Sequence, residues 1–259
     1  MWEEVSAHIY KHMKIMAKRP GELAWIFVYP FISFLSVGIL AFFLISEGAP
    51  LDSMMFVFVG VIVWNLYGLT QRAVTYGITF DIWSASLKHS FIGKSSIRHF
   101  VVGNALFGLT SSMATAVLIG IVGYFVFGFN LLVAGFFLVN LFFVFIFATA
   151  IGLVINGLML AKGDKYMSLI WMGTGIIMIF SGIYYPVSIL PVPMQAISNA
   201  IPVSHSLASL RASLGFGQSL AVNSLVTGAA LSLVYLAIGA WIFRLGLKRG
   251  RTSGMITKY

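Results

Sequence analysis

The chain contains no cysteine, and its titratable side chains are sparse and scattered. The lack of cysteine excludes both a disulfide framework and a thiolate metal site. The histidines are His8, His12, His89, His99 and His205, and they do not gather on one element with supporting carboxylates. His8 and His12 have the four-residue spacing of zinc ligands on a helix, but no third ligand lies near them in the sequence. We therefore predict no metal site.

Charged residues are also few, at 9% of the 259 positions, whereas hydrophobic residues make up 59%. A soluble domain of this length needs a charged surface. A lipid bilayer instead favours apolar surface and requires only that backbone groups bond internally, as they do in helices. The composition predicts an all-α polytopic membrane protein with a single transmembrane domain over residues 1–259. The first residues are polar and carry acids, which predicts no signal peptide.

Apolar runs of about 20 residues, the length that crosses a bilayer, occur six times. They cover residues 24–45, 54–75, 103–125, 131–153, 169–185 and 222–243. Before the first run, apolar residues recur at helical spacing, namely Val5, Ile9, Met13 and Met16. Residues 1–21 are therefore predicted to form an amphipathic interfacial helix. This helix either only anchors the chain to the membrane surface or also contacts a cytoplasmic partner.

Basic residues are concentrated at every second connection between these runs. They are Lys11, Lys14, Lys18 and Arg19, then Lys88, Lys94 and Arg98, then Lys162 and Lys165, and finally Arg244, Lys248, Arg249, Arg251 and Lys258. Because cytoplasmic loops carry an excess of Lys and Arg, both termini are predicted in the cytoplasm of a multi-pass protein of the plasma or inner membrane. The net charge of +9 also suits anionic membrane lipids. It does not indicate nucleic-acid binding, because the charges form no single patch.

The stretch "SFIGKSS" (90–96) contains the Gly-Lys-Ser that ends a nucleotide-binding P-loop. A complete loop has a second glycine five positions before Gly93, so that backbone N–H groups can surround the phosphates. That position is Lys88, and the residues before it do not form an apolar strand. We therefore predict that this chain does not itself bind ATP.

Residues 186–218 form a segment that is too apolar for a solvated loop, and we call it the proline segment. Four prolines break it, namely Pro186, Pro191, Pro193 and Pro202. Pro193 suits the first turn of a short helix that ends near Ala200. Ser204 suits the N-cap of a second helix, which Gly215 and Gly217 would end. We predict two short re-entrant helices at outer-leaflet depth, where such backbone is tolerated only against protein or around a cavity.

The third apolar run carries small residues at four-residue spacing, namely Asn104, Gly108, Ser112, Ala116 and Gly120. Such a stripe lets another helix approach closely, either within the chain or in a second copy. The sixth run has a weaker stripe of Ser224, Gly228 and Ser232. The amides within the runs are Asn65, Asn104, Asn140 and Asn156. Hydrogen bonding between helices is favoured for them over contact with a substrate.

A family resemblance emerges from the order of residues around the proline segment. That order is Gly182, Tyr184, Tyr185, Pro186, Leu190-Pro191, Ile201-Pro202 and then Arg211. Together with the interfacial helix and six runs, it resembles the permease subunits of type-2 ATP-binding-cassette exporters, which move drugs, glycolipids, polysaccharides or teichoic-acid precursors. The resemblance implies a homodimer that forms the translocation pathway. It also implies two copies of a separate ATPase subunit, which binds the ATP and magnesium.

The resemblance further implies that residues 76–99 form a cytoplasmic coupling loop that docks on the ATPase. The residues expected to contact it are Trp83, Leu87, Lys88, Phe91 and Lys94. Trp83, Leu87 and Phe91 have the four-residue spacing of one apolar helix face. Lys88 departs from the family, whose members often have an acid in its place. The alternative is a basic loop that only fixes topology.

The same resemblance assigns an outer gate to Tyr184, Tyr185, Pro186, Pro191, Pro202 and Arg211. The tyrosines are alternatively aromatics of the membrane interface. We favour the gate because Pro186 is expected to end the fifth span directly after them. Arg211 has three candidate partners, which are a lipid phosphate, the carboxylates of Glu47 or Asp52, and the substrate.

Two other functions remain possible from the sequence. A membrane-embedded lipid-modifying enzyme would need clustered acids or histidines at one interface, and the seven acids here are scattered. An ATP-independent channel or scramblase would need no ATPase. A neighbouring reading frame that encodes an ATPase with a complete P-loop would therefore favour the exporter over this alternative. The prediction is a transporter permease and not an enzyme.

The topology can be tested directly because the chain has no cysteine of its own. Single cysteines at Ser46 and Ser219 should react with an impermeant maleimide in intact cells. Cysteines at Ser95 and Ser253 should react only after permeabilisation. Labelling at Ser95 in intact cells would overturn the six-span topology.

Overall fold

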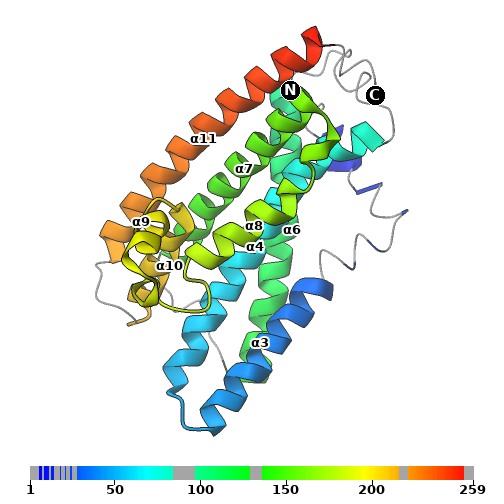
Figure 1. Ribbon diagram of the computed structural model, residues 1–259. Helices are drawn as coiled ribbons and strands as arrows, with labels where there is room; N and C mark the ends of the chain where they lie inside the picture. Colours follow the sequence, from blue (N-terminus) through cyan, green and yellow to red (C-terminus); the bar gives the residue numbers. More distant parts are fainter. Residues whose placement is uncertain are drawn as a thin grey trace.

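The computed structural model describes residues 28–83, 97–128, 136–215 and 221–253, with single positions between 6 and 24. Every regular element within these residues is a helix (Figure 1). The α-helices are α3 (Tyr29–Ser46), α4 (Leu51–Trp83), α6 (Ile97–Phe127), α7 (Phe137–Lys162), α8 (Leu169–Phe180), α9 (Val192–Asn199), α10 (Pro202–Ser213) and α11 (Ala221–Thr252). Two short 3-10 helices, η3 (Asp164–Tyr166) and η4 (Val187–Ile189), flank α8. The predicted all-α class is confirmed.

Five of these helices, α3, α4, α6, α7 and α11, are long and apolar enough to cross a membrane. The predicted fifth span, 169–185, is wrong as a continuous helix. α8 has 12 residues, about 18 Å, which is less than the roughly 30 Å of hydrocarbon. The helix stops before Gly182, whose φ of +68° is a backbone conformation that side-chain-bearing residues rarely adopt.

Three helices are much longer than the apolar runs that predict them. α4, α6 and α11 have 33, 31 and 32 residues, or about 46 to 50 Å. Polar residues beyond the hydrocarbon continue a helix as readily as apolar ones, so the end of an apolar run does not mark the end of its helix. The predicted loop 76–99 is accordingly shorter, because α4 continues to Trp83 and α6 begins at Ile97. Its central residues, 84–96, lie outside the described part of the chain.

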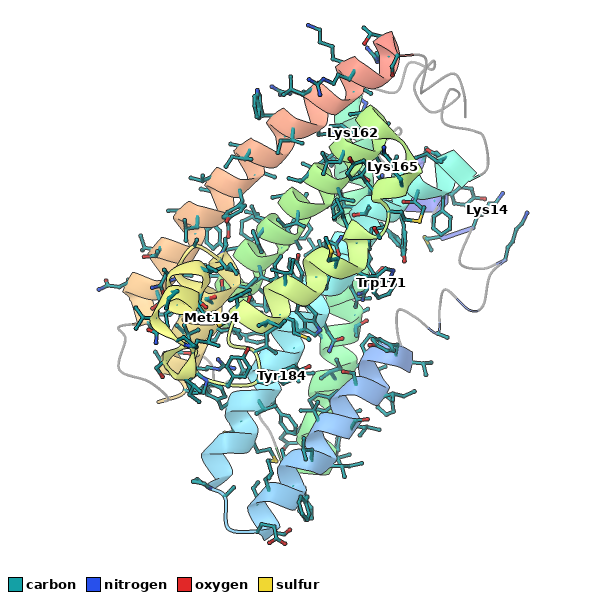
Figure 2. The ribbon with its side chains drawn as sticks, viewed as in Figure 1. Lys14, Lys162, Lys165, Trp171, Tyr184 and Met194 are labelled. Atoms are coloured by element: carbon teal, nitrogen blue, oxygen red, sulfur yellow. The ribbon has the colours of Figure 1, made fainter. Side chains whose placement is uncertain are left out.

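The long helices α4, α6, α7 and α11 run lengthwise, so their ends gather at two ends of the bundle (Figure 1). The end of α4, the start of α6, the end of α7 and the end of α11 lie at one of them, which we call the basic end. Lys162 and Lys165 lie there, whereas Tyr184 and Met194 lie toward the opposite end (Figure 2). The alternation of basic connections in the sequence is thus matched by their position in space.

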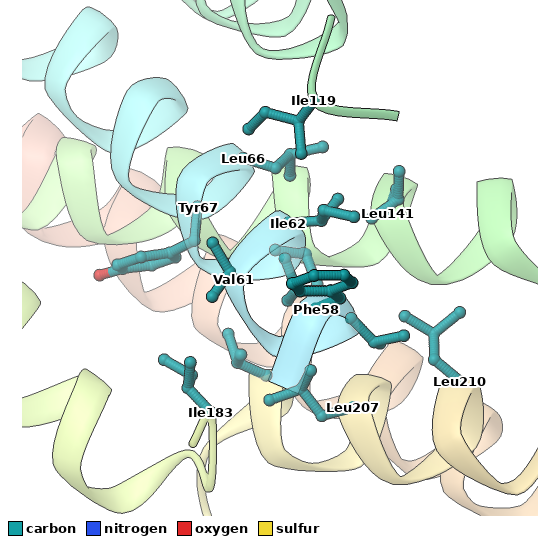
Figure 3. Packing of buried hydrophobic residues seen from close by; sticks show 14 of the residues in the cluster. Phe58, Val61, Ile62, Leu66, Tyr67, Ile119, Leu141, Ile183, Leu207 and Leu210 are labelled. Atoms are coloured by element: carbon teal, nitrogen blue, oxygen red, sulfur yellow. The ribbon is translucent and has the colours of Figure 1, made fainter. Parts of the chain in front are cut away.

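α4 is the central helix and packs against α3, α6, α7, α8 and α10. Its buried core face consists of Phe58, Val61, Ile62, Leu66 and Tyr67 (Figure 3). The Tyr67 ring lies 5.7 Å from that of Phe147 on α7, and Phe147 in turn meets Tyr235 on α11 at 5.1 Å. Offset and edge-to-face ring contacts of this kind stabilise a core beyond simple burial. One aromatic chain therefore joins α4, α7 and α11.

The third-run stripe packs within the chain. A Cβ on Gly108 would lie 3.0 Å from Ala73 and 3.2 Å from Thr70 Cα, both on α4. Ser112 Oγ lies 3.0 Å from Thr70 Oγ1. The weaker stripe on α11 meets α10, since a Cβ on Gly228 would lie 3.1 Å from His205 Cβ.

A further close contact joins α7 to α11 and was missed in the sequence. A side chain on Gly246 would run into the backbone of Gly157, and one on Gly239 would lie 3.2 Å from Ala150 Cα. Gly239 and Gly246 are seven residues apart on α11, as are Ala150 and Gly157 on α7, so small residues recur every second turn on both helices. The two backbones touch directly, as small residues permit in membranes.

Gly246→Ala should therefore destabilise the protein, by about 1–3 kcal/mol, because the added methyl group meets backbone that cannot turn aside. The matched control is Gly173→Ala on α8, where a Cβ meets nothing within 4 Å. This control should keep or slightly raise stability, since alanine favours helix. Thermal unfolding in detergent measures both variants, and equal unfolding temperatures would contradict the close α7–α11 contact.

Candidate functional site

The positions of the prolines determine where the short helices of the proline segment begin. Pro186 is the N-cap of η4, Pro191 is the N-cap of α9, and Pro202 is the first residue of α10. Proline is suited to helix starts because its φ is preset and its missing N–H is not needed in the first turn. The segment therefore folds into the two short helices that the sequence predicts.

The predicted N-cap of the second helix is wrong. Ile201 takes that position, and Ser204 lies within the first turn, with its Oγ 3.5 Å from the carbonyl oxygen of Phe180. Pro202 starts the helix earlier than a serine cap would. The end of α10 agrees with the prediction, because Gly215, with φ +88°, follows the C-cap Leu214. Gly217 lies outside the described residues.

Arg211, on the last turn of α10, is only 6% exposed. Its Nη1 donates to the Gly182 carbonyl at 2.6 Å, and its Nη2 donates to the Ile183 carbonyl at 2.7 Å. Nη2 and Nε also donate to the Phe56 carbonyl on α4, at 3.1 and 3.3 Å. The guanidinium carbon stands 3.3 Å from the centre of the Phe56 ring. One side chain thus joins α10, α4 and the turn after α8.

These contacts differ from the three partners considered for Arg211 in the sequence. Hydrogen bonds from a charged donor contribute about 1.5–3 kcal/mol each. The backbone carbonyls therefore satisfy the guanidinium in place of a carboxylate or phosphate. The neighbouring Gly60 completes the arrangement. A Cβ there would lie against the Ile183 carbonyl oxygen, so a glycine is needed for the turn to reach α4. Arg211 is therefore a positioning residue for this end of the bundle.

Tyr184 and Tyr185 lie in the turn between α8 and η4. Tyr184 is exposed, whereas the Tyr185 hydroxyl donates to the carbonyl of Ile179. The expectation that Pro186 directly ends the fifth span is wrong, because α8 already ends at Phe180. The tyrosines are instead presented by an irregular turn that Arg211 holds in place.

Of the residues expected to contact an ATPase, Trp83 is the last residue of α4. Leu87, Lys88, Phe91 and Lys94 lie outside the described residues. Near the end of α4, the buried Asp81 pairs with Lys11 Nζ. The N-terminal segment is thus joined to the place where the expected coupling loop leaves the bundle.

Two of the intramembrane amides bond helix to helix. Asn156 on α7 donates to the Val74 carbonyl on α4 at 2.9 Å, and Asn140 donates to Ser209 Oγ on α10 at 3.1 Å. Asn65 instead bonds within its own helix. A buried amide in an apolar surrounding needs such partners, so the preferred interpretation is confirmed for Asn140 and Asn156 and is wrong for Asn65.

Two further polar residues of α4, Gln71 and Arg72, were not among the predicted site residues. Gln71 is fully buried and accepts a hydrogen bond from Thr174 on α8 at 3.1 Å. The guanidinium carbon of Arg72, the next residue of α4, lies 5.5 Å from the centre of the Trp171 ring on α8. A basic residue within an apolar run was the available signal. In the described part of the chain, no three His, Asp or Glu residues gather as a metal site.

Comparison with known families gives one finding. A family model described as ABC-2 type transporter matches residues 3–214, which is most of the chain and extends just past the end of α10. The helix α11 lies beyond the match. Comparison with curated proteins gave no match.

Replacing Arg211 by leucine should destabilise the protein, by about 2–4 kcal/mol, because buried carbonyls lose a charged donor. Arg211→Lys should recover only part of this, since one ammonium cannot reach three carbonyls in the geometry of a guanidinium. Arg244→Gln, at an exposed position of α11, serves as the control for lost charge. Thermal unfolding measures stability, and a stable leucine variant would show that the carbonyl contacts are dispensable.

Proposed function

The chain belongs to the ABC-2 type transporter family, and we propose that it is the membrane subunit of an ATP-driven exporter. Two copies form the translocation pathway, and two copies of a separate ATPase subunit bind at the basic end. The observation that carries the proposal is the family match. It extends from the N-terminal segment through α10 and so includes the elements that pathway and coupling require.

Orientation follows from charge. We assign the basic end to the cytoplasm, because cytoplasmic connections are enriched in Lys and Arg. α8 and the residues beside it make a fifth crossing, α11 makes the sixth, and both termini are then cytoplasmic. The proline segment lies at the outer face of the plasma or inner membrane, with α9 and α10 as re-entrant helices.

α4 supplies the physical connection between the two ends. It is one helix of 33 residues without a proline, so it transmits displacement along roughly 50 Å. Near its start, Phe56 is bonded to Arg211 and through it to the outer turn. Its last residue, Trp83, leads into the coupling loop. A movement of the loop by the ATPase therefore reaches the outer segment through α4.

The N-terminal segment takes part in the same coupling. The Lys11–Asp81 ion pair ties it to the last turns of α4. Because Asp81 is buried, breaking the pair would remove an opposite charge from a buried carboxylate, which costs several kcal/mol. The segment is thus a second contact through which the ATPase side acts on α4, in addition to anchoring the chain to the membrane.

The second copy and the outer gate are linked in this proposal. Large apolar side chains are exposed on α3, α8 and α11, among them Phe42, Met172 and Trp241. Such surfaces need lipid or a second copy to cover them. We place the dimer axis beside the exposed Tyr184, so that the tyrosines of both copies close the pathway on the outer side.

The coupling loop provides the test. Leu87→Asp with Phe91→Asp would bury charge in the apolar contact with the ATPase, at a cost of several kcal/mol. An ATPase that co-purifies with the wild type should therefore no longer co-purify with the double variant, and transport-linked ATP hydrolysis should collapse. Membrane insertion should persist, because the loop lies outside the hydrocarbon.

The matched control is Ala85→Asp with His89→Asp, which adds the same charges to the same loop but off the apolar face. This control should retain the ATPase at equal permease yield. Normal co-purification and turnover of the Leu87 and Phe91 variant would mean that the loop only fixes topology. Absence of any co-purifying ATPase with the wild type would favour the channel or scramblase alternative.

A further inference from the structure

Arg72 is a cation deep within an apolar helix. The candidate span of α4 is Met54–Ile82, and Gly68 is its middle residue. The Arg72 guanidinium folds back over Gly68, since a Cβ there would lie 3.2 Å from Nη1 and 3.4 Å from Nη2. The side chain thus points toward the middle of the span, away from the nearer basic end. Helix side chains ordinarily lie back toward the N-terminus in this way, but a charged arginine in a membrane helix normally reaches the interface, so the depth at which Arg72 holds its charge needs an explanation.

Within the described residues, the guanidinium of Arg72 has no hydrogen-bond acceptor and no carboxylate partner. Besides lying over Gly68, the guanidinium faces the Trp171 ring, with its carbon 5.5 Å from the ring centre. Arg211 provides an internal comparison, because that guanidinium is saturated by three backbone carbonyls. The chain therefore satisfies one buried arginine completely and leaves the donors of the other available.

The surroundings of Arg72 combine hydroxyl groups with apolar surface. Tyr29, Tyr67 and Tyr76 lie within electrostatic range of the guanidinium. The Tyr67 hydroxyl is buried and has no hydrogen-bond partner among the described residues. On the adjoining α8, Trp171 and Met172 are 50% and 56% exposed. A ligand at this place would find hydrogen-bond donors beside an apolar face that is open to the exterior of the chain.

We propose that Arg72 binds the anionic head group of an amphiphilic ligand, with the hydrocarbon part lying along α8. The guanidinium presents paired N–H donors that match the oxygens of a phosphate or carboxylate. The apolar surroundings strengthen such a charge pair, and the exposed α8 side chains favour a ligand with a hydrocarbon chain over a free ion. The inference rests on the proposed function in one respect: if the chain is an exporter subunit, the ligand is its cargo and lies on the pathway side of α4.

Binding to the full chain in nanodiscs of zwitterionic phosphatidylcholine tests the site. Dodecyl phosphate is the probe, dodecyl maltoside is the uncharged amphiphile, and inorganic phosphate is the anion without a hydrocarbon chain. Calorimetry should give dodecyl phosphate an affinity for wild type at least tenfold above that for Arg72→Gln. Arg244→Gln, which loses the same charge at an exposed site, should bind as wild type does. The maltoside should not distinguish the variants.

Equal affinity of Arg72→Gln and wild type for dodecyl phosphate would overturn the site. If wild type bound inorganic phosphate as tightly as dodecyl phosphate, the proposal that the ligand is an amphiphile would be overturned. If Arg72→Gln does not elute as a folded species, Arg72→Lys replaces it. The lysine keeps the charge but loses the paired donors, so dodecyl phosphate should raise its unfolding temperature less than that of wild type. An equal rise would contradict the proposal.

These measurements use no ATPase, so they are independent of the coupling experiment. Arg72→Gln should still co-purify with the ATPase, because the residue is remote from the loop. Lost head-group binding with retained ATPase supports the site. A chain that binds the head group but no ATPase would contradict the proposed function and leave the site standing.

Discussion

The guanidinium of Arg211 must be satisfied inside the protein, and the end of the bundle opposite the basic end is organised around this requirement. Its acceptors come from α4 and from the turn after α8. Backbone carbonyls released by an irregular turn are costly at membrane depth unless they find donors. Arg211 therefore supplies donors to the carbonyls of the turn, and those carbonyls supply acceptors to the buried cation. Gly60 lets the turn lie close to α4.

With that contact in place, α4 becomes the element that relates the two ends. It is buried by five neighbouring helices, carries the aromatic core, and meets Asn156 and Thr174 through polar bonds to its backbone and side chains. Apolar packing alone gives little preference for one register over another in lipid, where tails and side chains are equally apolar. The buried hydrogen bonds and glycine contacts select the register.

Much of the fold could be predicted from the sequence. Long apolar runs predict α3, α4, α6, α7 and α11, and Pro193 predicts the start of α9, whereas the start of α10 was predicted too late, with Ser204 as the N-cap. The shortness of α8 was not predictable from apolarity, because it depends on a glycine in a left-handed conformation. The partners of Arg211 were not predictable either, since backbone carbonyls have no sequence signature. Arg72 was visible as a charge within a run, but its burial and orientation depend on Gly68 and α8.

The direct backbone contact between α7 and α11 has a consequence for motion. Side chains between helices can change rotamer and let the helices slide, but Gly157 and Gly246 have none to change. Packed interfaces of this kind are rigid and do not deform gradually. α7 and α11 should therefore move together as one body, and movement in a transport cycle must be sought between this pair and the other helices, α4 included.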